Sequence, residues 1–294
     1  MNIEVNGKKL VIGGEWIRIA RLEEEWYEDV TNPDELIEGL RSCGERADVL
    51  SFWQRLPDVT PAFQYRLQRD AIAALPITSY SAWWEKQIDG KTRNMVRRAE
   101  KKGVVIKPSA FDDKFVEGMT AIFNETPIRQ GKPFWHYGKD FATVKREFSR
   151  YLFREEMLGA YLDHELLGFV MLAHAGRYAA LGQIISKIEH RDKAPNNILL
   201  AKVVERCAEK GLPYLVYAKW DDGPLGDFKR HNGFQRFDLP RYFVPLNSKG
   251  RLYLALNLHQ GITGLIPRPL LRRMKHIRRK VREGYGQWTA RKAS

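Results

Sequence analysis

The alternation of apolar and polar positions is most regular in the middle of the chain. Two apolar runs within residues 157–176 flank a polar triplet at residues 163–165. This pattern predicts a β-hairpin, and the apolar residues at 177–186 predict a third consecutive strand. The sequence therefore predicts an antiparallel meander of three strands.

Helical spacing follows the meander. The apolar residues of the next segment are spaced by three and four: Ile198, Ala201, Val204 and Ala208. Pro195 suits the first turn of a helix, and Lys210 and Gly211 suit its last turn and its C′ position. The apolar run at residues 214–218 then predicts a buried strand. Together these segments predict a β-α-β unit.

Three short elements are expected after this unit. They are a helix at residues 223–231, a turn at Asn232-Gly233 and a final strand at residues 241–245. The turn is predicted because an Asn-Gly pair readily adopts positive φ.

A basic helix is predicted before the meander. Apolar residues recur at helical spacing and predict one buried stripe: Trp84, Ile88, Met95 and Ala99. Arg93, Arg97 and Lys101 are spaced by four, which places three cations on another face. Gly103 fits the C′ position, and residues 104–106 read as a buried strand. A row of cations is ordinarily a solvated surface, and it also attracts an anion.

The remaining segments give a β-β-α-β opening and two later helices. Strands are expected at residues 10–14, 16–22 and 47–56, with a helix at 33–41 that has Asn32 as N-cap. Helices are also expected from Asp112 to Glu125 and from about residue 140 to Phe153. Between them, residues 126–140 are rich in Gly, Pro and aromatic residues, which predicts a loop. No internal sequence repeat is detectable.

Length and composition favour one large α/β domain or two smaller ones. The chain has 294 residues, 44% of them hydrophobic. No run approaches the ~18 apolar residues of a membrane span, and Met1-Asn2-Ile3-Glu4 does not resemble a signal peptide. The expected location is therefore cytoplasmic. Cys43 and Cys207 stand far apart with no ligand-like spacing, so no disulfide framework or zinc site is expected.

The charge is large and uneven. The net charge is +13, and residues 266–294 hold ten basic side chains against one acidic side chain. Residues 1–50 hold twelve acidic and six basic side chains. This polarity favours an anionic partner, which could be nucleic acid, a phosphorylated compound or an acidic membrane surface.

The order of elements resembles that of the GNAT superfamily of N-acyltransferases, in the branch that contains the Fem-type aminoacyltransferases and the acetyltransferase-like proteins of polysaccharide gene clusters. Two stretches carry the resemblance: TRNMVRRAEKKGVVI at residues 92–106 and LGDFKRHNGF at residues 225–234. It covers about residues 48–246. Fem-type proteins are two tandem GNAT-like units, often with a coiled-coil insertion that is not visible in this chain.

The resemblance implies an α+β fold with a mixed, mostly antiparallel sheet flanked by helices. It implies a partial GNAT-like unit at residues 1–78, a GNAT-like acyltransferase domain at 79–250 and a basic extension at 251–294. The implied activity is transfer of an acyl group from acyl-CoA to an amine of an anionic, cell-envelope acceptor. Two alternatives remain: a Fem-type enzyme that uses aminoacyl-tRNA, and a nucleic-acid-binding protein without catalysis.

The donor loop departs from the family pattern. Acyl-CoA enzymes of this superfamily commonly hold the pyrophosphate with a glycine-rich loop at a helix start, whereas residues 190–197 contain no glycine. Backbone N–H groups at a helix start still attract anions. The residues expected to contact CoA there are Arg191, Lys193, Asn196 and Asn197.

Amine attack on an activated acyl carbon needs orientation, a proton acceptor and stabilisation of an oxyanion, but no covalent nucleophile. Asp227 is the predicted base, Lys229 the predicted oxyanion or phosphate partner and Tyr217 a further catalytic candidate; Asp221 and Asp222 lie in the same stretch. For each, a purely structural role is the competing interpretation.

Five residues are predicted to bind substrate. Arg93, Arg97 and Arg98 are expected to hold an anionic group, and Trp135 and His136 to contact the acceptor or to pin their loop. No metal is expected, because the seven histidines show no ligand-like pairing and His164-Glu165 lacks the second histidine of a zinc motif.

The tail is predicted to form an amphipathic basic helix at residues 266–294. Its apolar residues are spaced by four, three and four: Leu270, Met274, Ile277 and Val281. Such a helix can lie on the inner face of an anionic membrane, hold tRNA phosphates, or dock on the acidic N-terminal part of the same chain.

Overall fold

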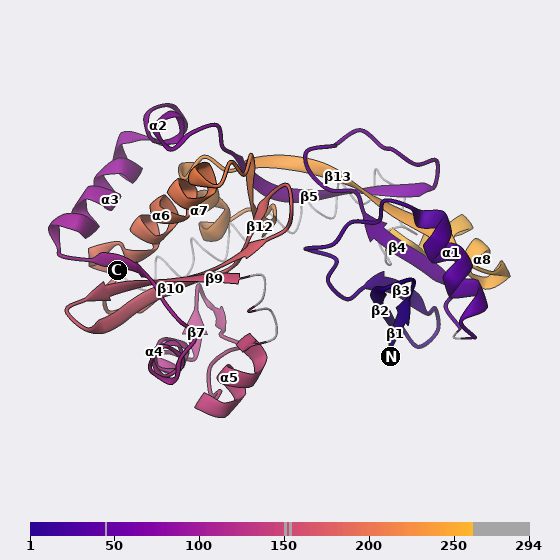
Figure 1. The fold of residues 1–294 in the computed structure, drawn as a ribbon, viewed down its shortest axis with the longest axis horizontal. Helices are drawn as coiled ribbons and strands as arrows, with labels where there is room; N and C mark the ends of the chain where they lie inside the picture. The colour runs from indigo at the N-terminus through magenta and orange to yellow at the C-terminus, as the bar shows by residue number, and fades with distance from the viewer. Residues whose placement is uncertain (45, 150–151, 153–154, 261–294) are drawn as a thin grey trace, which may run out of the picture.

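Two lobes share one twisted sheet in this protein (Figure 1). The computed structural model describes residues 1–260 except 45, 150–151 and 153–154. The predicted tail helix at 266–294 lies outside the described residues. Two long strands, β5 (Arg66–Pro76) and β13 (Gln235–Pro245), run from one lobe into the other.

The large sheet has eleven strands in the order β1-β2-β3-β4-β13-β5-β12-β11-β10-β9-β6. The other strands of this sheet are β1 (Asn2–Val5), β2 (Lys8–Gly13), β3 (Ile19–Leu22), β4 (Val49–Trp53), β6 (Val105–Pro108), β9 (Glu155–Leu162), β10 (Glu165–His174), β11 (Ala179–Ser186) and β12 (Tyr214–Lys219). A separate two-stranded hairpin pairs β7 (Ile128–Arg129) with β8 (Lys132–Pro133).

Helices pack against the sheet in both lobes, and in the C-terminal lobe they cover both of its faces. The helices are α1 (Pro33–Ser42), α2 (Tyr80–Ala82), the π-helix η1 (Trp83–Gln87), α3 (Gly90–Lys101), α4 (Asp113–Asn124), α5 (Phe141–Phe148), the 3-10 helix η3 (Arg191–Lys193), α6 (Pro195–Glu209), α7 (Pro224–His231), α8 (Ser248–Ala255) and the 3-10 helix η4 (Leu258–Gln260). In Figure 1, α2, α3, α6 and α7 lie over one face, and α4 and α5 lie over the other.

The two lobes repeat one topology. In each, three strands form an antiparallel meander, a helix crosses over, and a fourth strand returns parallel to the third. The N-terminal set is β1-β2-β3-α1-β4, and the C-terminal set is β9-β10-β11-α6-β12. The repeat exists in topology although the sequence shows none, because many sequences satisfy the same pattern of buried and exposed positions.

The next strand of each set is exchanged. β5 follows β4 in the chain but pairs with β12, whereas β13 follows β12 but pairs with β4. β5 and β13 then pair with each other over nine residues. The tandem, mostly antiparallel α+β fold predicted from sequence is therefore confirmed, and the exchange makes the sheet continuous through both lobes.

Each lobe has its own apolar core. In the N-terminal lobe, Leu36 and Leu40 of α1 pack against Leu10 and Leu50 of the sheet. In the C-terminal lobe, α6 and α3 cover one face through residues such as Val96 and Leu199.

The opposite face of the C-terminal sheet carries a third core. Met119 and Phe123 of α4 and Val144 of α5 pack there against Phe169 and Ile185. Successive residues of these strands alternate between the two faces, so they pack against two different sets of helices.

Most predicted elements are present near their expected positions. The meander, the helix at Pro195–Glu209 and the strand at Tyr214–Lys219 are all confirmed. Asp112 caps α4 by accepting a hydrogen bond from the Phe115 N–H at 2.8 Å. Among the described residues, no helix has the length and apolar character that a membrane span needs.

The predicted stripe of the basic helix was wrong. Helix α3 begins at Gly90, so Trp84 belongs to the π-helix that precedes it. The residues of α3 that are buried are Thr92, Val96 and Ala99. The chain turns between the two helices, which breaks the single register that the prediction assumed.

Two further predictions need correction. Residues 104–106 do not form a buried strand, because β6 is an edge strand in which Val105 is half exposed. The helix expected up to Phe153 is described as Phe141–Phe148, and its expected end at Phe153 lies outside the described residues. The last strand starts at Gln235, six residues earlier than predicted. Edge position and strand length depend on the neighbouring strands, which the local pattern does not reveal.

Candidate functional site

The sheet opens between β11 and β12. These parallel strands pair only through Ala179–Leu215 and Ala180–Val216. β11 then continues to Ser186 and β12 to Lys219 without further pairing between them. Unpaired backbone groups at the carboxyl ends of parallel strands are a common place for a ligand to bind.

The backbone of β12 is irregular at this opening. Its pairing with β5 shifts register after Val216, and Ala218 has φ of +51°. The pairing of β12 with β11 ends at the same residue, Val216. Trp220 continues the chain by donating its N–H to the Ala71 carbonyl at 2.9 Å.

Lys229 of α7 is buried beneath the end of β12, with 1% of its surface exposed. Its ammonium donates to the Lys219 carbonyl at 2.7 Å and to Asp221 Oδ2 at 2.8 Å. It also lies 4.8 Å from the ring centre of Tyr217. A buried ammonium needs such partners, so Lys229 is held in place and holds Asp221 in turn.

Asp221 is the carboxylate that Lys229 holds at the end of β12. Its side chain is 40% exposed although one oxygen is bound to Lys229. Gly226 permits the close packing, because a Cβ at that position would lie 2.1 Å from the Asp221 carbonyl oxygen. The end of β12 therefore carries a fixed and accessible carboxylate.

Tyr217 contributes a neutral hydroxyl. Burial raises the pKa of the phenol, and the negative charge of Asp221 raises it further. Its ring packs against Phe234 at 5.9 Å between ring centres. Tyr217 is thus a hydrogen-bond donor at neutral pH.

Asp227 lies on the outer side of α7, away from this pair. Its carboxylate forms an ion pair with Arg230 and is 58% exposed. The structure therefore joins Lys229 to Asp221 and does not bring Asp227 to it. The predicted role of Asp227 as base stays a prediction, and Asp221 is the carboxylate that the geometry favours.

Helix α3 borders the corner between α7 and β13. The Thr92 hydroxyl donates to the His231 carbonyl at 3.1 Å, and the Trp83 indole donates to the Asn232 carbonyl at 3.0 Å. Helix α3 and this corner are therefore in direct contact.

The three arginines of α3 differ in their surroundings. Arg93 is used locally, since its Nη1 donates to the carbonyls of Trp84 and Ile88 at 2.9 and 2.7 Å. Arg97 lies over the Trp84 ring at 5.6 Å, and Arg98 is exposed. Neither Arg97 nor Arg98 forms an ion pair with another described residue, so these two cations remain available to an anion.

The predicted donor-binding residues surround the start of α6. Arg191 is exposed, and Lys193 Nζ lies 3.0 Å from His190 Nδ1. The Asn197 N–H donates to the Ala194 carbonyl at 3.1 Å. The buried Oδ1 of Asn196 has no hydrogen-bond partner among the described residues. The four residues are neighbours, and their role toward a co-substrate stays a prediction.

Glu125 is a residue that the sequence did not single out. It lies just after α4, yet its carboxylate accepts the N–H groups of Ile188 and Glu189 in the loop between β11 and α6. Arg129 pairs with it at 3.0 Å. No local pattern could have revealed this contact, because 63 residues separate Glu125 from Ile188.

The aromatic loop predicted to contact an acceptor is partly internal. His136 is 1% exposed and its ring stacks on Phe123 at 4.3 Å. Burial lowers the pKa of His136 to about 4, with the Lys139 charge contributing. Trp135 is 73% exposed, with the Lys139 ammonium 4.5 Å from its ring centre. His136 therefore pins the loop, and Trp135 is the accessible member.

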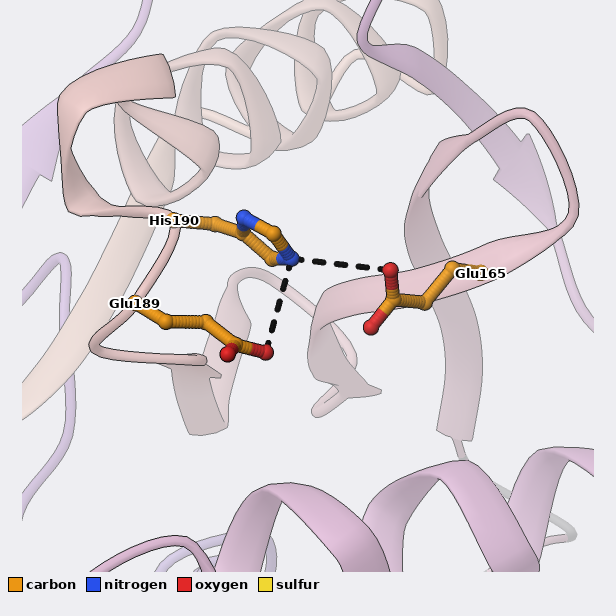
Figure 2. A group of neighbouring side chains, drawn as sticks. All are labelled: Glu165, Glu189 and His190. Atoms are coloured by element: carbon orange, nitrogen blue, oxygen red, sulfur yellow. Dashed lines mark ion pairs between the residues drawn. The ribbon is translucent and has the colours of Figure 1, made fainter.

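Figure 2 shows Glu165, Glu189 and His190 gathered beside the loop that follows β11. His190 Nε2 lies 3.5 Å from each carboxylate. Lys187 pairs with both carboxylates, and Lys193 donates to His190 Nδ1. The cluster therefore has the bonding of an ion-pair network, and the expectation of no metal stays a prediction.

Cavities also lie elsewhere in the described part of the chain. A groove of about 530 Å³ runs between α4 and the β9–β10 hairpin, lined by residues that include Lys114, Tyr161 and Lys187. Another of about 550 Å³ is lined by residues of the N-terminal lobe and by Arg177 of the C-terminal lobe. Neither contains a predicted site residue.

The tandem meanders, the opening between β11 and β12 and the helix that follows give this chain a tandem, GNAT-like fold. Solved structures share this fold. FemX matches with 12% identity and a TM-score of 0.55, over 87% of this chain and 89% of FemX. L-PGS from Bacillus licheniformis matches with 12% identity and a TM-score of 0.57, over 82% and 83% of the two chains.

A third structure is the C-terminal domain of a lysylphosphatidylglycerol synthetase candidate from Agrobacterium fabrum, with 12% identity, a TM-score of 0.53 and coverage of 87% and 88%. No protein-family model matches the sequence. No curated protein matches it either. The predicted resemblance to the Fem-type branch is thus confirmed for the fold.

Proposed function

We propose that this protein transfers an acyl group from an activated ester or thioester to an amine, at the open ends of β11 and β12. The observation that carries this proposal is the pair formed by buried Lys229 and accessible Asp221 beside that opening. A fixed carboxylate at the end of a splayed strand suits proton transfer at a bound acyl group.

The proposed reaction forms one bond and breaks one. The amine nitrogen attacks the carbonyl carbon, a C–N bond forms, and the C–O or C–S bond to the leaving group breaks. Asp221 accepts the proton that the amine loses, and Lys229 positions Asp221. The neutral Tyr217 hydroxyl donates to the oxyanion or to the leaving group. Reaction rate also depends on holding donor and amine together.

The donor and the acceptor are proposed from charge and from the similar structures. The exposed Arg97 and Arg98 suit an anionic substrate, and so does the chain's net charge of +13. One similar structure is named for lysylphosphatidylglycerol synthesis, which favours aminoacyl transfer to an anionic envelope compound. Acyl-CoA and aminoacyl-tRNA are the two donors to test.

Location and membrane contact are part of this proposal. We place the protein in the cytoplasm, with residues 266–294 in contact with the inner face of the membrane. The basic composition of that segment supports this placement.

The test is an enzyme-dependent acyl transfer to hydroxylamine, measured as hydroxamate, with acetyl-CoA and with a mixture of aminoacylated tRNAs. Asp221→Asn should lower kcat by about 100-fold or more. Asp222→Asn is the matched control, because the side chain of Asp222 is fully exposed; it should stay close to the unmodified protein.

Asp227→Asn separates the two carboxylate assignments. A larger loss from Asp227→Asn than from Asp221→Asn would restore Asp227 as the base. Absence of turnover with both donors, alongside tight binding of tRNA, would replace the enzyme by a nucleic-acid-binding protein.

A further inference from the structure

The loop between β11 and α6, residues 187–194, lies where a phosphate of a bound donor would be expected. It begins at the opening of the sheet and leads into a helix of fifteen residues. Free N–H groups and the helix dipole make such a position an anion site in many proteins. The contacts of this loop therefore decide which donors can bind.

An internal carboxylate already occupies the N–H groups of this loop. The two oxygens of Glu125 accept the Ile188 N–H at 2.6 and 2.7 Å, and one of them accepts the Glu189 N–H at 2.9 Å. Consecutive backbone N–H groups that converge on a carboxylate have the geometry of an anion-binding nest. Glu125 thus occupies the N–H groups at the beginning of this loop and places a negative charge beside it.

Arg129 fixes Glu125 in this position. Its Nη2 lies 3.0 Å from Glu125 Oε2, and the two side chains are 13% and 19% exposed. The same guanidinium donates to the carbonyls of Ser186 and Ile122, both at 2.9 Å. Burial lowers the pKa of Arg129, whereas the Glu125 charge raises it. Moving Glu125 aside would leave a buried guanidinium without its counter-charge.

The end of the loop, where α6 begins, is also unfavourable to a bound pyrophosphate. Pro195 has no N–H at the first position of α6. Ala194, with φ of +50°, carries a Cβ at a left-handed position that glycine would leave open. Glu165 and Glu189 also lie at this loop (Figure 2), and Lys187 pairs with both.

We propose that Glu125 determines donor specificity: its carboxylate closes the loop to the pyrophosphate of a nucleotide thioester such as acyl-CoA. The inference rests on the proposed function and deepens it, because the donor is then an activated ester whose phosphates are held elsewhere on the protein. Arg97 and Arg98 of α3, which pair with no described acidic residue, provide such a surface.

The experiment is isothermal titration of the full chain with CoA and, separately, with inorganic pyrophosphate. The unmodified protein should show no saturable binding at millimolar ligand. Glu125→Ala and Glu125→Gln, each shown by circular dichroism to be folded, should gain pyrophosphate binding of at least about tenfold in affinity, a change of 1.4 kcal/mol. Glu117→Ala is the control, since Glu117 is an exposed carboxylate of α4, the helix that Glu125 follows; it should gain nothing.

Two results would overturn the inference. One is saturable binding of CoA to the unmodified protein. The other is a folded Glu125→Gln variant that still does not bind pyrophosphate, since the charge would then not be the determinant.

Failure of the proposed function has a different signature. Turnover of acetyl-CoA in the hydroxamate assay would overturn the inference and leave the acyltransferase intact. Turnover of aminoacylated tRNA alone would support both. Absence of turnover with either donor would remove the proposed function, whatever the titrations show.

Discussion

Lys229 and Glu125 illustrate how single residues acquire their roles in this protein. Lys229 contacts a carbonyl ten residues earlier in the chain, and Glu125 contacts N–H groups 63 residues later. Each is a charged group that is mostly or wholly buried and that is tolerated because its hydrogen bonds are satisfied. Asp221 is the accessible group at the site, and the buried Lys229 positions it.

His136 leads to a prediction about pH. Its ring is buried among aromatic side chains, and both ring nitrogens lack a partner among the described residues. Its folded pKa of about 4 lies below the ordinary value of 6.5. The unfolded chain therefore takes up the proton first as pH falls. The stability contributed by neutral His136 is complete above pH 6.5 and is lost as pH falls toward 4.

We expect the free energy of unfolding to fall by about 2 to 3 kcal/mol more between pH 7 and pH 4.5 in the unmodified protein than in His136→Phe. Urea unfolding at both pH values measures this difference. His164→Gln, at an exposed histidine, should keep the original pH dependence. Equal pH dependence in the unmodified protein and in His136→Phe would contradict the assignment.

At the scale of the element, α3 has two faces with different tasks. Its buried face packs on α6, and its start is capped by Asp89, which accepts the Thr92 N–H at 2.7 Å. The exposed face carries Arg97 and Arg98. A helix fixed this firmly can present cations to a polyanion with little loss of conformational freedom.

Removing these cations should weaken RNA binding. Arg97→Gln combined with Arg98→Gln should raise the Kd for tRNA and lower the slope of log Kd against log salt by about 1 to 2, since each lost phosphate contact removes about 0.7 to 0.9. Filter binding at several salt concentrations measures both. The matched control is Lys145→Gln combined with Arg146→Gln on α5, over the opposite face of the sheet. An equal effect in both pairs would show that only net charge matters.

At the scale of the whole molecule, the exchanged strands join two lobes that could otherwise fold separately. β5 and β13 each contribute to the sheet of both lobes, so neither lobe keeps its complete sheet when the other unfolds. The predicted boundary at residue 78 falls just after β5. The division at residues 78 and 250 remains a prediction about domains.

We therefore expect a single cooperative unfolding transition. Leu50→Ala in the N-terminal lobe and Leu172→Ala in the C-terminal lobe each remove a fully buried side chain and should each cost about 2 to 5 kcal/mol. In both variants, circular dichroism and tryptophan fluorescence should give coincident transitions in urea. A biphasic curve, with only one phase shifted by each variant, would show that the lobes unfold independently.

The sequence alone determined many of the local elements and their order, but it predicted neither β1 nor the long strand β5. Asp112, Pro195 and Gly211 mark helix ends through caps and φ preferences, which depend on a few adjacent residues. The spacing of apolar residues determined the meander and α6, because burial on one face imposes a period of 2 or 3.6. The sequence also singled out Lys229, through the motif that contains it, and its predicted role as oxyanion or phosphate partner stays a prediction.

Only the tertiary structure decided which distant groups meet. The pairing of β13 with β4 joins residues almost 200 apart in the chain, and it depends on the twist and packing of the whole sheet. The packing of the whole sheet also determines which groups contact Lys229, and it places Glu125 against the loop after β11. A residue's type limits the bonds it can make, but the folded chain selects the partner, because hydrogen bonds form only between groups brought within about 3 Å.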